Sequence, residues 1–227
     1  AISSDYTREN VYWLEAGSEP GLRMAQRDGA PGAGSTPNAF GDTRRYEEDH
    51  VYWRAVPNGE GQDHWFWSQL WVGGSIPATV DYAFDLHHIA AGGPDGEVDV
   101  ILHGATYGDH ATQLYLNNVA LLPPTEQAWA GKVEKRYQIP VSQSLFMEGT
   151  NHLRVESALP AGESSSEIYV NGFAVTYQDT YVAEDDRLLF SVPSAGTYAF
   201  HVTGFSTGDV GLLHVTDPVA PAQIVNP

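Results

Sequence analysis

The residues of this sequence that are best suited to bind a ligand form a short aromatic run. His64-Trp65-Phe66-Trp67 is followed by Gln69 and Trp71. In a strand, the three tryptophans could share one face, and exposed indoles beside Asp63 would suit the face of a sugar. Tryptophan also buries large areas in cores, where packing demands the same alternation, and burial is the favoured interpretation. The candidate ligand-binding residues are Asp63, His64, Trp65, Trp67 and Trp71.

Three acidic segments could supply oxygen ligands to a metal ion: Glu47-Glu48-Asp49, Asp95-Gly-Glu-Val-Asp99 and Glu184-Asp185-Asp186. Calcium takes about six to eight oxygens, which carboxylates and loop carbonyls provide. None of the segments matches a calcium-loop motif, and solvated loops are the alternative. The candidate metal ligands are Glu47, Asp49, Asp95 and Glu97, for one structural calcium ion.

We predict no catalytic residue. The chain has no cysteine, which excludes a thiol nucleophile and a thiolate metal site within it. No Gly-x-Ser-x-Gly occurs, and the adjacent His87 and His88 would point to opposite faces of a strand, which argues against one metal held by both. A metal bound with His103 or His110 has no spacing signature. Paired carboxylates for glycoside hydrolysis are not decided by sequence, so a self-contained hydrolase is the least favoured function.

The charge of the chain excludes two classes of partner. Its 227 residues contain 29 acidic and 11 basic side chains, a formal charge of −18. Such a surface repels phosphate backbones and anionic lipids, so we expect neither nucleic-acid nor membrane binding. No apolar run approaches the length of a membrane span, and the first residues lack a signal-peptide pattern. We therefore expect that any export signal has been removed or lies outside this sequence.

Short segments rich in β-branched and aromatic residues, separated by turn residues, predict an all-β fold that is a sandwich or jelly roll. Residues 80, 82, 84 and 86 are apolar and alternate with polar or small residues, as in a sheet with one buried side. Residues 168–177 are expected to form one strand despite Asn171-Gly172, a strong hairpin signal. The other expected strands are 46–53, 65–72, 78–88, 98–103, 112–116, 132–139, 152–157, 188–192, 197–203 and 211–216.

The middle of the chain resembles galactose-binding-like jelly rolls. The resemblance rests on Leu114-Tyr-Leu-Asn-Asn-Val119, Trp129-Ala-Gly131, Tyr137-Gln-Ile-Pro140 and Leu145-Phe-Met-Glu-Gly-Thr-Asn-His-Leu-Arg-Val155. Gly149 and Asn151 permit a tight reversal, and Asn118 stands where that family usually has glycine, because asparagine tolerates left-handed geometry. This resemblance covers residues 43–178, and it raises the expectation of a structural calcium.

A second resemblance uses the ends of the chain. Asn10-Val-Tyr-Trp-Leu14, Glu47-Glu-Asp-His-Val-Tyr-Trp53, Asp63-His-Trp-Phe-Trp67 and residues 198–221, with Gly204-Phe205 and Val215-Thr-Asp-Pro218, are similar to the region that precedes the catalytic domain in gingipain-like cysteine peptidases. Those enzymes are secreted or surface bacterial proteins. The resemblance implies a non-catalytic accessory fragment that positions a downstream catalytic domain or docks substrate. A carbohydrate-binding module that uses exposed tryptophans is the second hypothesis.

The expected organisation is a jelly roll over residues 35–179 and a discontinuous small β unit from 1–34 and 180–217. The first piece would begin with a hairpin over residues 10–27, and neither piece has enough strands to bury an apolar face alone. Chain termini that lie close together allow such an insertion. Residues 218–227, which are rich in proline, are expected to be a linker towards a downstream domain.

Overall fold

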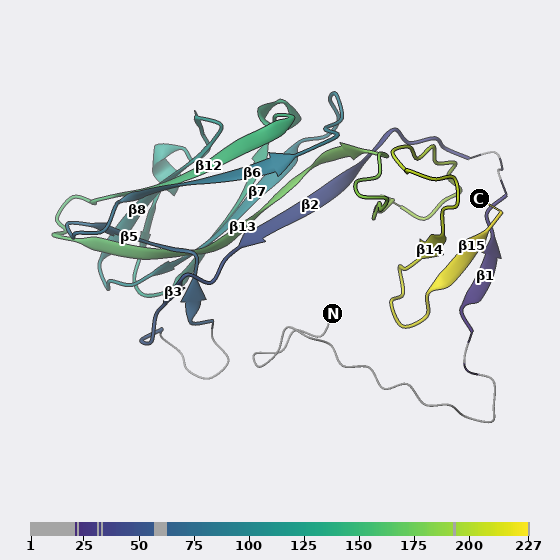
Figure 1. The fold of residues 1–227 in the computed structure, drawn as a ribbon. Coiled ribbons are helices and arrows are strands. Elements are labelled where there is room, and N and C mark those ends of the chain that lie inside the picture. Colours follow the sequence, from purple (N-terminus) through teal and green to yellow (C-terminus); the bar gives the residue numbers. More distant parts are fainter. Residues whose placement is uncertain are drawn as a thin grey trace. The chain divides into compact units, whose positions relative to one another are not determined.

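The structure is a computed structural model that describes residues 21, 23–30, 32, 34–56, 63–192 and 194–226. The chain divides into two compact units (Figure 1). The larger unit is Gly32–Ser206, and the smaller one combines Ala1–Pro31 with Thr207–Pro227. In the described residues, no helix is long and apolar enough to cross a membrane.

The larger unit is a jelly-roll β-sandwich, as predicted. One sheet has the order β10-β8-β12-β6, and β9 pairs with β8; the other has the order β11-β7-β13-β2, and β5 pairs with β13. The strand bounds are β2 Ala39–Glu47, β3 Val51–Tyr52, β4 Trp65–Phe66, β5 Ser68–Val72, β6 Thr79–Leu86, β7 Gly96–Gly104, β8 Asp109–Leu116, β9 Val119–Ala120, β10 Ala128–Ala130, β11 Glu134–Val141, β12 Gly149–Ala158 and β13 Ser166–Thr180. Two short 3-10 helices, η1 Pro124–Glu126 and η2 Gln143–Leu145, lie in the connections.

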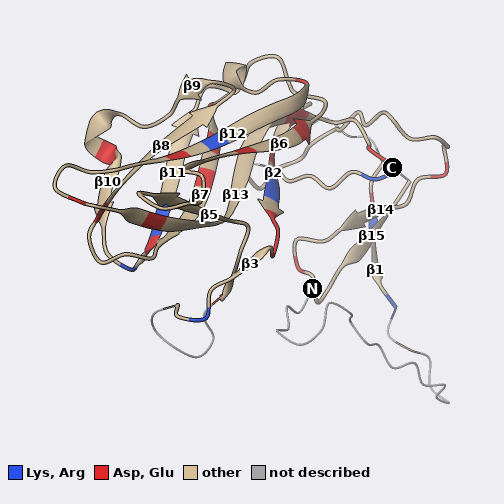
Figure 2. Cartoon of the chain, turned by 60° about the vertical axis from the view of Figure 1, so that its left-hand side comes forward, with Lys and Arg blue, Asp and Glu red and all other residues tan. Residues whose placement is uncertain are grey.

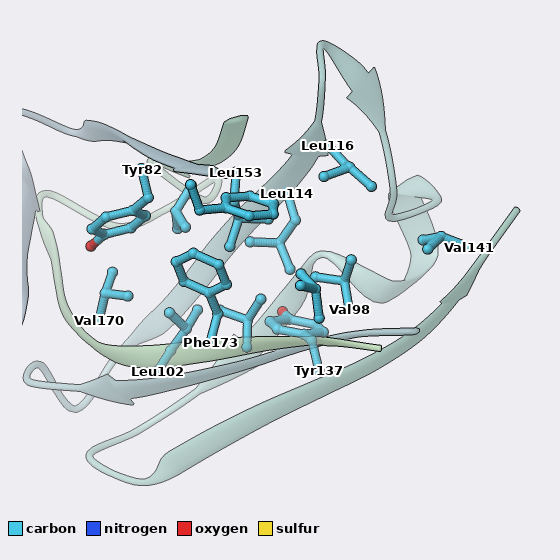
Figure 3. Packing of buried hydrophobic residues seen from close by; sticks show 14 of the residues in the cluster. Tyr82, Val98, Leu102, Leu114, Leu116, Tyr137, Val141, Leu153, Val170 and Phe173 are labelled. Carbon is cyan, nitrogen blue, oxygen red and sulfur yellow. The ribbon is translucent and has the colours of Figure 1, made fainter. Parts of the chain in front are cut away.

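The core fills the space between the two sheets (Figure 3). In β6, Tyr82, Phe84 and Leu86 are buried and the residues between them are exposed, which confirms the predicted alternation. Opposite them, Leu102 and Phe173 come from β7 and β13 of the other sheet. Two facing layers of alternating apolar residues are what stabilises a sandwich.

A buried asparagine organises the turn that precedes β12. Asn151 is inaccessible to solvent; its side-chain oxygen accepts hydrogen bonds from the Met147 amide and Asn117 Nδ2, both at 2.8 Å. Its amide nitrogen donates to the Met147 and Gly149 carbonyls. Asn118 has φ +67°, which confirms the left-handed geometry predicted for it, and Gly149 has φ +86° in the turn where a tight reversal was predicted.

The long strand β13 runs through Asn171-Gly172 without a hairpin, as predicted. The register with β7 shifts between Val170 and Gly172, so Asn171 is the extra residue of a β-bulge. β5 pairs with residues 166–170 of β13, and β2 pairs with residues 172–180. Pairing with three other strands holds the dipeptide in extended backbone and overrides its local turn preference.

Residues 181–206 differ from the prediction, which placed them in the small unit. They belong to the sandwich unit because an aromatic cluster holds them there. Phe190 lies 6.0 Å from Phe40 of β2 and 5.1 Å from Tyr181, measured between ring centroids, and Phe200 lies 4.8 Å from Phe190. The predicted strands 188–192 and 197–203 are absent from the described backbone, where only isolated bridges form at Tyr198 and Thr203.

The smaller unit contains a three-stranded sheet of order β1-β15-β14. Its strands are β1 Ala25–Asp28, β14 Leu212–His214 and β15 Ala222–Val225, and β1 pairs with β15 in parallel. The tail that we expected to be a linker, 218–227, therefore contributes a strand. The predicted hairpin over 10–27 lies mostly outside the described residues. We expected Val11, Trp13, Leu22 and Met24 to be among the apolar residues of the small unit; the first three lie outside the described residues, and Met24 is exposed.

Candidate functional site on the β3–β4 hairpin

A short aromatic hairpin carries part of the predicted ligand site. β3 and β4 pair antiparallel with Val51 opposite Phe66 and Tyr52 opposite Trp65. Side chains alternate across a strand pair, so the hairpin has two different faces. Val51, Trp53 and Phe66 belong to a hydrophobic cluster, whereas Tyr52 and Trp65 are exposed.

The inner face of the hairpin packs on the outer surface of β13. The indole of Trp53 stacks on the Tyr169 ring with centroids 4.8 Å apart and planes 5° apart. Phe66 is only 2% exposed and lies 5.1 Å from the same ring. Burial raises the pKa of Tyr169 to about 12, and the Glu167 carboxylate adds to this rise. The hairpin is therefore fixed to the sheet by aromatic packing.

The outer face presents two large aromatic side chains to solvent. Tyr52 is 54% exposed and Trp65 is 45% exposed. Their ring centroids lie 5.1 Å apart, with the planes tilted by 56°. The His64 ring stacks 5.8 Å from Tyr52, and its Nδ1 lies 2.9 Å from the Trp53 carbonyl oxygen. These ring contacts bring Tyr52, His64 and Trp65 together on the outer face of the hairpin.

Carboxylates border the hairpin. Asp63 accepts hydrogen bonds from the Trp65 amide at 2.8 Å and from Asn171 Nδ2 at 3.2 Å, so the bulge residue of β13 helps to hold it. Burial raises the pKa of Glu47, and the negative charges of Asp63 and Asp49 raise it further. The predicted candidates Glu47, Asp49 and Asp63 thus lie close enough to interact.

The other two tryptophans of the predicted site do not belong to the exposed pair. Trp67 packs against the sandwich core and stacks on Phe173 with centroids 5.8 Å apart and planes 2° apart. Leu70 is fully buried in that core, so its neighbour Trp71 points to the opposite face. A β-carbon on Gly74 would lie 2.1 Å from Trp71, so that indole lies against the Gly74 backbone. The three tryptophans do not form one platform, because the strand is interrupted between β4 and β5.

The predicted metal ligands fall into two separate places. Glu47 is opposite Gly172 of β13, and Glu97 is opposite Thr176, four residues and about 13 Å further along that strand. Asp95, which lines a cleft, is two residues from Glu97 and belongs to the second place. Asp49 is two residues from Glu47 and belongs to the first. In the part of the chain that the structure describes, no three His, Asp or Glu side chains are arranged to hold a metal ion.

A charged cluster lies where β2 and β13 meet, and of its members sequence reasoning had singled out only Glu184, as part of an acidic segment. The Arg44 guanidinium is 2.6 Å from Asp42 and 3.2 Å from Glu184, and 3.9 Å from Asp179. Asp179 is 2% exposed; burial raises its pKa to about 7, and the nearby Asp42 charge contributes. Arginine supplies the cation at the centre of these three carboxylates, so the donor set does not fit a divalent metal. The acidic run that contains Glu184 and the alternation in the two strands were the sequence signals for this cluster.

A polar cleft of about 480 Å³ opens between the loop 89–95 and η2. Gln143 closes its floor, donating to the Gln178 carbonyl at 2.9 Å and accepting from the Gln178 amide at 3.0 Å. Burial alone would raise the pKa of Glu148, but the hydrogen bonds that its carboxylate accepts from the Ile89 and His88 amides, together with the nearby His87, outweigh burial and lower this pKa. The polar groups of this cleft are thus largely engaged in holding the loop.

The structure contains a serine–histidine pair, but solvent does not reach it. His110 Nδ1 lies 2.8 Å from Ser166 Oγ, and both residues are fully buried. Trp129 covers the imidazole with ring centroids 4.3 Å apart, and burial lowers the pKa of His110. A nucleophile must contact its substrate, so this pair has a structural role.

No protein-family model matches the chain, and no curated protein matches it. Among solved structures, the fold matches part of dimeric latent PorU from Porphyromonas gingivalis with a TM-score of 0.65 and 11% identity. The match covers 89% of this chain and 19% of the PorU chain. PorU is a gingipain-like C-terminal signal peptidase, so the resemblance predicted from the sequence is confirmed for the fold.

Carbohydrate-binding modules give weaker matches. The module CBM36 in complex with calcium and xylotriose has a TM-score of 0.36 and 11% identity over 59% of this chain and 98% of that one. The CBM36-1 domain of a xylanase from the hindgut metagenome of Trinervitermes trinervoides has a TM-score of 0.37 and 10% identity over 60% and 95%. These scores are too low to establish a common fold.

Proposed function

We propose that this chain is a non-catalytic binding module of a larger secreted bacterial protein, with the β3–β4 hairpin as its contact surface. The observation that carries the proposal is the hairpin itself, which packs Trp53 and Phe66 against β13 and exposes Tyr52 and Trp65. Exposed aromatic residues on a rigid support are enriched in interfaces. The match to PorU supports a place within a longer chain, because it covers 19% of that protein.

The finer proposal is that the module accompanies a gingipain-like cysteine peptidase domain in the same polypeptide and positions it or docks its substrate. The reading frame beyond residue 227 tests the parentage: a domain with catalytic cysteine and histidine is expected, and a stop codon there would exclude it. The role is tested in the longer protein by the double variant Tyr52→Ala, Trp65→Ala. We expect unchanged cleavage of a short peptide and weaker processing of a protein substrate, with the exposed Tyr107→Ala as control.

Carbohydrate binding is the second candidate, since Trp65 and Tyr52 are accessible and carboxylates border them. Titration of the intrinsic tryptophan fluorescence with xylo- and cello-oligosaccharides tests it. A change that Trp65→Ala abolishes and Tyr107→Ala retains would establish this function. Absence of any response would leave the accessory role alone.

A structural calcium ion is a separate proposal, and the carboxylates described above do not form a ready site for it. Thermal melts with calcium and with a chelator decide the matter. When the free calcium concentration is about 100 times the dissociation constant, binding stabilises the fold by roughly 2.7 kcal/mol, which raises Tm by several degrees. Equal melts would discard calcium, and loss of a hydrolytic activity on chelation would overturn the accessory role.

A further inference from the structure

We propose that the hairpin surface binds a basic polypeptide segment from outside this chain. This surface consists of Tyr52, His64 and Trp65 with the bordering carboxylates Glu47, Glu48 and Asp63. An arginine or lysine of the segment lies over the aromatic pair, and its neighbours meet the carboxylates. The inference rests on the proposed binding function and names the partner of the same site.

The shape of the aromatic pair favours a cation over a flat ring. Tyr52 and Trp65 are tilted by 56° with centroids 5.1 Å apart, so they form a compact raised pair and not a continuous plane. A sugar ring stacks best on a broad flat face. A guanidinium or ammonium group needs only one ring face within about 6 Å.

The charge around the pair has the sign that such a partner needs. The described residues 47–56 and 63–66 contain four carboxylates and one arginine, Arg54. Burial is the main cause of the raised pKa of Glu47; the nearby Asp63 and Asp49 charges raise it further, and Arg45 opposes them. In Figure 2 the segment that joins β2 to β3 is acidic, and red exceeds blue over the whole chain. A basic segment relieves this repulsion and is attracted from a distance.

The same chain shows that its aromatic rings accept cations. Lys132 Nζ lies 4.5 Å from the centre of the Tyr107 ring, and Arg154 lies 4.2 Å from that of Tyr115. Within the described part of the chain, Tyr52 and Trp65 have no such internal cation. We therefore expect a partner to supply the cation that lies over these two rings.

The net charge also decides which partners are unsuitable. A second copy of this chain carries −18 and has only 11 basic residues, so like charges would oppose its approach. Nucleic acid is repelled for the same reason. The partner that this surface favours is a polypeptide segment with several arginines or lysines and enough apolar surface to cover Tyr52.

The test uses the intact 227-residue chain and two acetylated twelve-residue peptides. One contains four arginines separated by serine and leucine, and the other has citrulline, the neutral isostere, at those positions. Calorimetric titration is expected to show binding of the arginine peptide, at least tenfold weaker binding of the citrulline peptide, and affinity that falls with added salt.

Variants locate the interaction. Tyr52→Ala and Trp65→Ala are each expected to weaken binding about twofold to fivefold, the range for an exposed cation–aromatic contact. The double variant Glu47→Gln, Glu48→Gln tests the charge without removing a ring. Tyr107→Ala and Glu97→Gln, on other parts of the sandwich, are matched controls that should leave binding unchanged.

The outcomes separate this inference from the proposed function. Equal binding of both peptides, or binding that neither the aromatic nor the acidic variants weaken, overturns the inference. Oligosaccharide binding lost in Trp65→Ala, with no peptide binding, overturns the inference and keeps the binding module. Absence of binding to peptides and to oligosaccharides overturns the inference, and the protein-substrate assay then decides the proposed function alone.

Discussion

The flat stack of Trp53 on Tyr169, with planes 5° apart, is the contact that fixes the hairpin to the sandwich. Tyr169 lies in β13, the strand that pairs with β7, β5 and β2. The position of Tyr52 and Trp65, on the other face of the hairpin, therefore depends on β13, which is held by three neighbouring strands.

We expect Trp53→Ala to loosen this attachment. Loss of a half-buried indole and its stack should lower the free energy of unfolding by about 2 kcal/mol. Hydrogen exchange should also accelerate in residues 50–56 and 63–66. Tyr52→Ala, one residue earlier and exposed, is the control and should change stability by less than about 0.5 kcal/mol. Equal effects of the two variants would show that the stack does not anchor the hairpin.

Asp179 should make stability depend on pH. Its folded pKa of about 7 lies above the ordinary value near 3.9, so the folded state holds the proton more tightly. Asp179 therefore contributes up to about 4 kcal/mol to the free energy of unfolding below about pH 4. This contribution is lost as the pH rises through 7.

The neutral variant Asp179→Asn isolates this contribution. Relative to the unmodified chain, it should melt at a similar temperature at pH 4.5 and at a higher one at pH 8. The exposed Asp209→Asn serves as the control. The measured quantity is the difference in melting temperature between the variant and the unmodified chain at each pH. This comparison is needed because the lowered pKa of buried His110 destabilises both chains at acid pH. A difference that does not change with pH would contradict the prediction.

Phe190 should hold residues 184–206 on the sandwich. Phe190→Ala removes contacts to Phe40, Tyr181 and Phe200, so we expect about 2 kcal/mol of lost stability and faster proteolysis within this segment. The adjacent Leu189 is 66% exposed, and Leu189→Ala is the matched control with little expected effect. Unchanged proteolysis in Phe190→Ala would mean that another contact holds the segment.

Gly172 should tolerate no side chain at the bulge. A β-carbon there would lie 2.8 Å from the Tyr46 carbonyl oxygen and 3.1 Å from Glu47 Cβ. Gly172→Ala should cost about 1 to 3 kcal/mol because both neighbours are constrained by the sheet. Gly41→Ala, in the paired strand, meets only the Gln178 side chain at 3.9 Å and is the control. Equal melting temperatures for the two variants would contradict this account.

The sequence by itself determined the elements that depend on local pattern. Alternation in residues 80–86 set the buried face of β6, and asparagine and glycine at positions 118 and 149 set the turns of the jelly roll. The composition determined the acidic surface and excluded thiol chemistry. These features follow from residue type and spacing, so they could be predicted without knowing which strands become neighbours.

Only the tertiary structure decided which side chains meet. Trp65, Trp67 and Trp71 have the spacing of one face, yet an interruption between β4 and β5 sends them to different surroundings. Arg44 joins Asp179 and Glu184, which lie far along the chain, because β2 pairs with the end of β13. Long-range strand pairing and the burial that it causes have no local signal. The same pairing kept Asn171-Gly172 extended, since three neighbouring strands outweigh one turn-forming dipeptide.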